Sequence, residues 1–362
     1  MSQLELYILA FFVAFTVSLL STPLVIKFAK AIGAVDQPDY RKVHKQVMPR
    51  MGGIAIIIGT IAGFLIVPVE SPYITSIIVG AGIIVIVGLL DDLYTLSAKY
   101  KLIGQLLAAG IVVMSGLRIE LINLPFDVQI QLGFVLSAIL TVLWIVAITN
   151  AINLIDGLDG LAAGVSTIAL ASILAMAILD GQYLVVPIAI ILIGSILGFL
   201  PFNFNPAKIF MGDTGALFLG YAIAVISVMG LFKSVTVFSL VIPIIILAIP
   251  IFDTIFAIVR RILNKKKISE PDKSHLHHCL LEMGFSHRKT VLIIYVVNIF
   301  FGVSAIVFSN AALWGSVIII AVLLLLIELS AELIGLIGNR RKPLINMFRR
   351  FVLKRPVRKH SN

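Results

Sequence analysis

The sequence carries acidic, amide and imidazole side chains at four places, each beside a long apolar run. Carboxylate and amide oxygens are the ligands that Mg²⁺ prefers, and imidazoles donate hydrogen bonds to phosphate oxygens. Side chains of this kind are typical of metal-assisted chemistry on a phosphorylated substrate, provided that the fold brings the four places together. The candidate residues are Asp91, Asp92, Asn153, Asp156, Asp159, Asn203, Asp213, His275, His277 and His278.

The Asp91-Asp92 pair follows an apolar run directly. Adjacent side chains on a helix point about 100° apart, so the two carboxylates cannot clamp one ion together. Two neighbouring negative charges are tolerated when a cation lies near or when one acid stays protonated. A solvated loop that ends a helix is the competing interpretation.

Asn153, Asp156 and Asp159 recur at every third position, which places them near one face of a helical turn. Gly157 and Gly160 between them permit tight turning or the close approach of a ligand. Polar groups are costly in a membrane protein, so this spacing favours function. The competing interpretation is a capping network at the start of the next helix.

Asn203 and Asp213 flank a polar segment, with Asp213 at the start of an apolar run. A carboxylate there can cap the helix or bind a metal ion. Mg²⁺ usually binds one or two protein carboxylates together with substrate phosphates, so Asp213 with one of the other acids fits it. Simple capping remains the competing interpretation.

His275, His277 and His278 stand in a basic segment and are followed by Cys279. A zinc site is one interpretation, but no second cysteine completes a structural zinc motif. Contacts to phosphate or sugar oxygens fit the basic surroundings better. Lys45 and Arg50 precede a Gly52-Gly53 helix start, where an anionic group would bind, although basic residues also serve as topology anchors.

The elements that must position these residues are membrane helices. Of the 362 residues, 60% are hydrophobic and 13% are charged, and the mean hydropathy is +1.11. A soluble globule has about 25% charged residues. The composition excludes a soluble or disordered chain, a secreted disulfide scaffold and a nucleic-acid-binding domain. Cys279 is the single cysteine, so no internal disulfide forms.

A helix needs about 20 apolar residues to cross the hydrocarbon layer. Eleven stretches meet this need, and none alternates as a barrel strand would. We therefore predict an all-α polytopic membrane protein, with residues 1–338 as one transmembrane catalytic domain and 339–362 as a basic tail. The stretches are 5–29, 52–69, 73–90, 100–117, 132–148, 160–179, 184–201, 212–231, 235–259, 291–310 and 312–337.

Eleven crossings place every Lys and Arg except Arg118 and Lys233 on one side. The positive-inside rule makes that side cytoplasmic, with the N-terminus outside and the C-terminus in the cytoplasm. The first stretch lacks the basic region of a cleaved signal, so we expect a retained helix. All four polar places fall at the cytoplasmic face. The basic tail either anchors the topology or binds anionic lipids, and Asp253, inside a predicted span, has no evident role.

Five motifs, taken in their order along the chain, resemble those of the polyprenyl-phosphate N-acetylhexosamine-1-phosphate transferase superfamily. The resemblance covers nearly the whole chain. Arg50 and the interrupted histidine motif make it more similar to the branch that loads N-acetylglucosamine-1-phosphate, at the start of teichoic acid or O-antigen synthesis, than to the peptidoglycan branch. The motifs are Pro49-Arg50-Met51-Gly52-Gly53, Asp91-Asp92, Asn153 to Gly160, Asn203 through Phe210-Met211-Gly212-Asp213, and His275-Leu276-His277-His278.

The resemblance implies transfer of N-acetylglucosamine-1-phosphate from a UDP-sugar donor to undecaprenyl phosphate in the cell membrane, with release of UMP. It implies Mg²⁺ as cofactor, with Mn²⁺ as the alternative ion, and no nucleic-acid partner. The sequence is equally compatible with a monomer and a homo-oligomer. The competing functions are transfer from UDP-N-acetylmuramoyl-pentapeptide, secondary transport, and a non-catalytic scaffold.

The resemblance also implies roles for single residues. Asp213 becomes the metal ligand, and Asp91 becomes the candidate base or acceptor-phosphate contact, with Asp92 beside it. Asp156 and Asp159 fall at the metal-linked diphosphate. The implied substrate contacts are Lys45, Asn153, Asn203, His275, His277 and His278.

Overall fold

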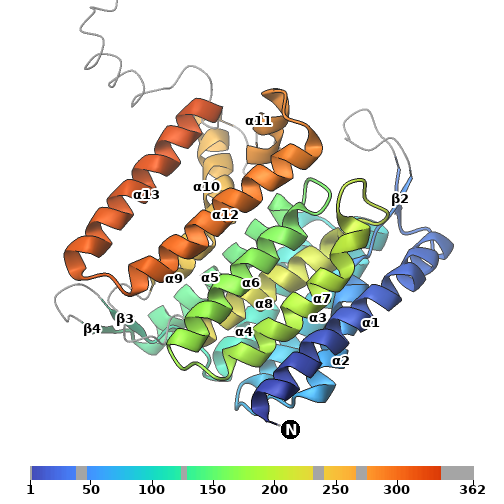
Figure 1. Cartoon of the computed structure of the whole chain (residues 1–362), viewed down its shortest axis with the longest axis horizontal. Helices are drawn as coiled ribbons and strands as arrows, with labels where there is room; N and C mark the ends of the chain where they lie inside the picture. Colours follow the sequence, from blue (N-terminus) through green and yellow to red (C-terminus); the bar gives the residue numbers. More distant parts are fainter. Residues whose placement is uncertain (1, 38–46, 124–128, 231–239, 266–274, 336–362) are drawn as a thin grey trace, which may run out of the picture.

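The computed structural model describes residues 2–37, 47–123, 129–230, 240–265 and 275–335, and Figure 1 shows a bundle of long helices. Two short antiparallel strand pairs, β1–β2 and β3–β4, join the helices near opposite ends. The strands are β1 (Val35–Asp36), β2 (Met48–Pro49), β3 (Leu121–Asn123) and β4 (Gln129–Gln131). The helices are α1 (Gln3–Ala31), α2 (Gly53–Ile66), α3 (Ile74–Tyr94), α4 (Ala98–Met114), α5 (Phe134–Ile155), α6 (Leu161–Leu179), α7 (Val185–Asn203), α8 (Gly212–Gly230), α9 (Val241–Ile246), α10 (Ala248–Leu263), α11 (Leu276–Glu282), α12 (His287–Ser309) and α13 (Leu313–Ile334).

Eight of the helices in the described part of the chain are long and apolar enough to cross a membrane: α1, α3, α5, α6, α7, α8, α12 and α13. This confirms a largely helical, polytopic membrane protein. The predicted spans at 52–69 and 100–117 are helical but shorter, since α2 has 14 residues and α4 has 17. The count of eleven crossings and the direction of the chain remain predictions. The basic tail lies outside the described residues.

The predicted span at 235–259 is not one straight helix. Residues 231–239 are outside the described part, α9 ends at Ile246, and α10 begins at Ala248. Pro250 has no N–H, so the carbonyl of Ile246 cannot receive the hydrogen bond that a continuous helix requires. Leu247 therefore separates the two helices with a non-helical ψ of 22°.

The strand pairs are a difference from the expectation of helices throughout. Val35 pairs with Pro49, and Asp36 pairs with Met48, so β1–β2 closes the loop between α1 and α2. The backbone of a connection between helices must satisfy its N–H and C=O groups, and a two-stranded clip does this locally. As a result Arg50 lies beside Asp36, with Nη2 and Oδ1 2.8 Å apart.

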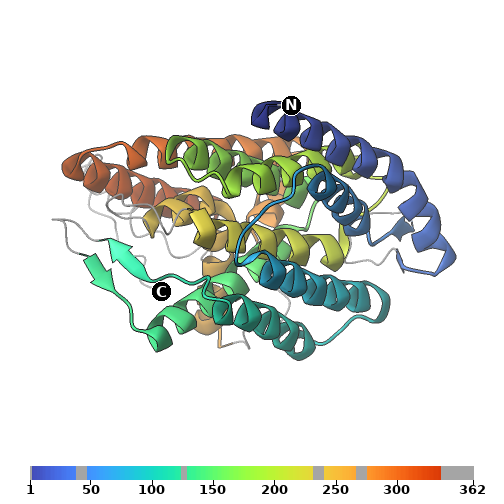
Figure 2. The same ribbon diagram turned by 90° about the horizontal axis from the view of Figure 1, so that it is seen from below.

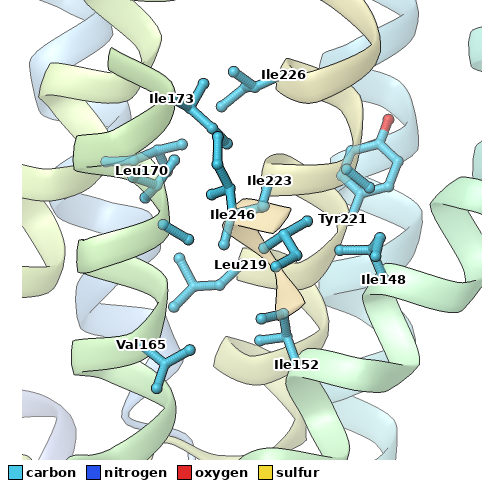
Figure 3. Close-up of a cluster of buried hydrophobic side chains, with 14 of the residues drawn as sticks. Ile148, Ile152, Val165, Leu170, Ile173, Leu219, Tyr221, Ile223, Ile226 and Ile246 are labelled. Carbon is cyan, nitrogen blue, oxygen red and sulfur yellow. The ribbon is translucent and has the colours of Figure 1, made fainter. Parts of the chain in front are cut away.

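Helix α8 occupies the centre of the bundle. It packs against α2, α3, α5, α6 and α7. Figure 2 shows it, in yellow, between the blue-green helices α3 and α4 and the green helices α6 and α7. In Figure 3, isoleucine, leucine and valine side chains of α5, α6, α8 and α9 fill the space beside it. This part of the interior is apolar.

Two glycines let α2 approach α8 closely. A Cβ on Gly53 would lie 2.2 Å from the Cα of Gly215, so Gly53→Ala forces the helices apart. We expect this variant to lose about 1–3 kcal/mol of unfolding free energy in detergent. Gly82→Ala on α3 meets nothing within 4 Å and should keep or gain stability. Equal melting temperatures for the two variants would contradict this packing argument.

Candidate active site

A cavity of about 660 Å³ opens at one end of the bundle. Its walls come from the β1–β2 clip, the end of α3, the α5–α6 and α7–α8 loops, and the starts of α8, α11 and α12. In Figure 1 this end carries β2 and α11, whereas the N-terminus and β3–β4 lie at the other. The polar residues that line it are Asp36, Arg50, Asp92, Asn153, Asp156, Asp159, Asn203, Asn205, Asp213, His278 and His287.

The four polar places of the sequence therefore do converge. Seven of the candidates line the cavity: Asp92, Asn153, Asp156, Asp159, Asn203, Asp213 and His278. Asp91, His275 and His277 are buried and do not line it. Lys45 lies outside the described residues.

Asp92 caps α8 from a distance in the chain. Its Oδ1 accepts the N–H of Asp213 at 3.0 Å, and its Oδ2 accepts the N–H of Thr214 at 3.1 Å and the Thr214 hydroxyl at 2.6 Å. The first N–H groups of a helix have no partner within the helix, so a carboxylate there stabilises it. Because Asp92 fills this position, Asp213 is left to face the cavity, and simple capping does not explain Asp213.

Asp91 points elsewhere, as expected for adjacent helical positions. Its Oδ1 accepts the N–H of Leu96 at 2.6 Å, and its Oδ2 receives Lys101 Nζ at 2.9 Å. Lys101 Nζ also lies 3.9 Å from Asp213 Oδ1, so one ammonium group faces both carboxylates. Sequence reasoning missed Lys101. The available signal was two lysines, Lys99 and Lys101, in the first turn of α4, shortly after an acidic pair.

Asp156 is the cavity acid with the least compensation. It ends α5 and is half-buried, and no hydrogen bond to its carboxylate is found within the described part of the chain. Burial and the nearby charges of Asp213, Asp92 and Asp159 raise its pKa to about 8. Concentrated negative charge of this kind favours a bound cation.

Asp159 and Asn203 hold two loops together. Asp159 Oδ2 accepts Asn205 Nδ2 at 2.8 Å and the N–H of Ala207 at 3.1 Å. Asn203 accepts the N–H of Gly160 and donates to the Ile209 carbonyl. The N-cap of α6 is Gly160, with φ +79°, and it provides no side-chain cap, which was the competing interpretation of this segment. Asp159 and Asn203 instead position the α5–α6 loop against the α7–α8 loop.

The first half of α12 contributes side chains that sequence reasoning did not identify. His287 lines the cavity, and its Nε2 accepts the N–H of Asp159 at 2.9 Å. Arg288 Nε donates to the Asn205 carbonyl at 2.9 Å, and the Tyr295 hydroxyl donates to the Gly160 carbonyl. The signal for His287 was a histidine at the beginning of an apolar run, which by itself does not indicate a site.

The three histidines of the motif have three different surroundings. His275 Nδ1 lies 2.8 Å from Asp253 Oδ2, whereas His278 lines the cavity. His277 is packed over Gly157, and neither of its ring nitrogens has a hydrogen-bond partner among the described residues. Burial and the neighbouring His278 ring lower the pKa of His277 to about 3, so it is neutral at physiological pH. Of these three histidines, His278 is the one that lines the cavity.

The cavity residues fit a Mg²⁺ ion. Asp156 and Asp213 supply two carboxylates, and this ion ordinarily takes one or two from the protein and shares substrate phosphates and water. Within the described ranges no group of three or more His, Cys, Asp or Glu side chains forms a metal cage. A closed zinc site at the histidines, with its four protein ligands, is therefore not present in that part.

Comparison with known proteins gives consistent matches. The family profile named glycosyl transferase family 4 matches residues 74–231. A Bacillus subtilis (strain 168) protein named "Probable undecaprenyl-phosphate N-acetylglucosaminyl 1-phosphate transferase" is 52% identical over 347 residues, which is 95% of this chain and 97% of the relative. A Mycolicibacterium smegmatis "Decaprenyl-phosphate N-acetylglucosaminephosphotransferase" is 37% identical over 82% of each chain.

A more distant relative covers much of the same length. The "Undecaprenyl-phosphate alpha-N-acetylglucosaminyl 1-phosphate transferase" of Escherichia coli (strain K12) is 31% identical over 275 residues, 74% of each chain. The stretch matched by the family profile begins at α3 and includes Asp91, Asp92, the α5–α6 loop, Asn203 and Asp213. The matched stretch therefore contains most of the acids that line the cavity.

Proposed function

The chain belongs to glycosyl transferase family 4, and from this premise we propose that it transfers N-acetylglucosamine-1-phosphate from UDP-N-acetylglucosamine to undecaprenyl phosphate. UMP leaves, and the product is a lipid diphosphate-sugar that begins a cell-envelope glycopolymer such as teichoic acid or O-antigen. The donor sugar is supported by the names of the relatives. The observation that carries the chemistry is the cavity in which Asp92, Asp156 and Asp213 converge at one end of a membrane bundle.

The location of the cavity suits both substrates. A polyprenyl tail stays in the lipid, so its phosphate lies at the membrane surface, level with the ends of the helices. The middle of the protein is filled with apolar side chains (Figure 3) and offers this charged group no site. The nucleotide donor is charged and arrives from water. We place the cavity on the cytoplasmic face of the plasma or inner membrane, because the basic residues concentrate on that side.

The reaction joins an oxygen of the acceptor phosphate to the sugar-linked phosphorus of the donor and breaks the bond to UMP. Mg²⁺, held by Asp213 and Asp156, would supply a Lewis acid that neutralises phosphate charge. Asp92 fixes the first turn of α8, so that Asp213 keeps its place. Asp159 and Asn203 hold together the α5–α6 and α7–α8 loops, which line the cavity, and Arg50 and His278 line it as well.

The geometry favours a counter-ion role for Asp91 over the base role that the resemblance implies. Its carboxylate is already bonded to Lys101 and to the N–H of Leu96, and Asp91 is buried and does not line the cavity. A monoalkyl phosphate has its second pKa near 6, so its oxygens are mostly ionised at pH 7 and need no base. Asp91 then keeps Lys101 directed towards Asp213.

The test is UMP release by purified protein in detergent. We expect UMP with undecaprenyl phosphate, Mg²⁺ and UDP-N-acetylglucosamine together, and none when any one is omitted. A parallel reaction contains UDP-N-acetylmuramoyl-pentapeptide. UMP only with that donor would overturn the choice of sugar. No UMP with either donor, from folded protein, would overturn the proposal and return attention to other UDP-sugars and to transport.

A further inference from the structure

Asp253 is a buried acid that the proposed chemistry does not use. It lies on α10, outside the catalytic cavity, and borders a largely apolar cavity of about 260 Å³ between α10, α11, α12 and α13. A carboxylate in such surroundings is costly unless hydrogen bonds or an opposite charge compensate it. Its partners therefore indicate what it does.

Both oxygens of Asp253 bind the beginning of α11. Oδ1 accepts the N–H of Leu276 at 2.7 Å, and Oδ2 lies 2.8 Å from His275 Nδ1. His275 is the N-cap residue of α11, yet its own side chain makes no capping hydrogen bond. Asp253 thus supplies from another helix the acceptor that the cap residue does not provide.

These two hydrogen bonds give α11 a direction that apolar packing cannot. Cys279 and Leu276 of α11 pack with Phe256 and Ala331, which holds the helix against α10 and α13. Hydrophobic contact is non-directional and leaves a short helix free to rotate. Hydrogen bonds depend on angle as well as distance, so Asp253 fixes the rotation of α11 at its first residue.

The rotation of α11 decides where its histidines point. The His275 ring is stacked on His277, with centroids 5.9 Å apart and planes 4° apart, and the His277 and His278 centroids are 4.2 Å apart. His277 Nε2 lies where a Cβ on Gly157 would be only 2.3 Å away, so its ring backs the loop of Asp156 and Asp159. A row of imidazoles thus connects Asp253 with the cavity.

We infer that Asp253 is a positioning residue for the phosphotransfer reaction: its bonds to His275 and Leu276 orient α11, which directs His278 into the cavity and seats His277 against Gly157. The inference rests on the proposed function, because it gives His278 a substrate to contact. Asp253 acts through α11 and touches no substrate itself.

The test compares single and double variants by UMP release. Asp253→Asn keeps an oxygen for Leu276 and loses the negative acceptor for His275, and we expect its kcat/KM to fall about 10- to 100-fold. The loss in kcat/KM should be divided between kcat and KM in the same proportion as the loss caused by His278→Ala. In Asp253→Asn/His278→Ala, the second change should cost less than about threefold, since residues that act through one another are not additive.

Further variants separate positioning from a purely structural role. Thr254→Val is the matched control, because among the described residues the Thr254 hydroxyl bonds only the carbonyl of Pro250 in its own helix, and it should retain wild-type activity. Asp253→Leu removes both acceptor oxygens and keeps a side chain of similar size. It replaces Asp253→Asn in the test if the Asn variant folds poorly. Effects that multiply in the double variant, or wild-type activity in folded Asp253→Asn and Asp253→Leu, would overturn the inference. An inactive wild-type protein would instead overturn the proposed function.

Discussion

Asp213→Ala should release UMP at least about 1,000-fold more slowly than the wild-type protein while folding normally. Removing a metal ligand leaves the phosphate charge uncompensated in the transition state, and a loss of this size corresponds to about 4 kcal/mol. The fold should survive because Asp213 does not cap α8. Asp92 accepts the N–H groups of residues 213 and 214, and the substitution leaves both backbone groups in place.

The measurement is a Mg²⁺ titration of UMP release, with thermal unfolding in detergent as the control for folding. Asp180→Ala is the matched variant, because Asp180 is the C-cap of α6, in the α6–α7 loop, and does not line the cavity. It should keep the wild-type rate and the wild-type Mg²⁺ dependence. Metal-dependent turnover within tenfold of wild type in folded Asp213→Ala would refute Asp213 as the metal ligand.

Residue type and spacing predicted which side chains lie together better than they predicted which groups bond one another. The reason is the free-energy cost of placing a charged side chain in the hydrocarbon layer. Acids that follow apolar helices must therefore lie at a helix end that water reaches. The cavity confirms that convergence for Asp92, Asp156 and Asp213. The helical character of the chain was predicted from hydropathy alone, and it is confirmed. Pro250 could have predicted the break at Leu247, because proline has no backbone N–H. Hydropathy alone does not detect this.

The hydrogen-bond partners of the polar side chains could not be predicted from the sequence. Asp91 and Asp92 are neighbours, yet one binds Lys101 and the other caps α8, more than a hundred residues away. The Asp253–His275 contact and the bond from Asp159 to His287 depend equally on tertiary packing. A single sequence contains no signal for such pairings, because local spacing fixes directions only within one helix.

Asp156→Asn should lower activity and raise stability at the same time. The substitution removes a carboxylate from the site of the proposed Mg²⁺ ion, and we expect turnover to fall about 100-fold. It also removes the charge that Asp213, Asp92 and Asp159 repel, while no hydrogen bond from a described residue depends on it. Active sites often keep such unfavourable charge for function, so removing it stabilises the fold.

The effect of Asp156→Asn on the free energy of unfolding should depend on pH. The pKa of Asp156 is raised from 3.8 to about 8 in the folded protein, so the folded state binds the proton more tightly than the unfolded state does. Stability from this group is therefore present at low pH and is lost as pH rises towards 8. Without metal, in EDTA, Asp156→Asn should melt at least about 2 °C above wild type at pH 9, with a smaller difference at pH 6.

Asp159→Asn is the contrasting variant for this experiment. Its carboxylate accepts hydrogen bonds from Asn205 and Ala207, so replacing it should lower both activity and melting temperature. Two acids three residues apart in one loop are thus expected to change stability in opposite directions. If Asp156→Asn melts below wild type at pH 9, its carboxylate is compensated by a partner, and the argument that its charge is held for a cation is wrong.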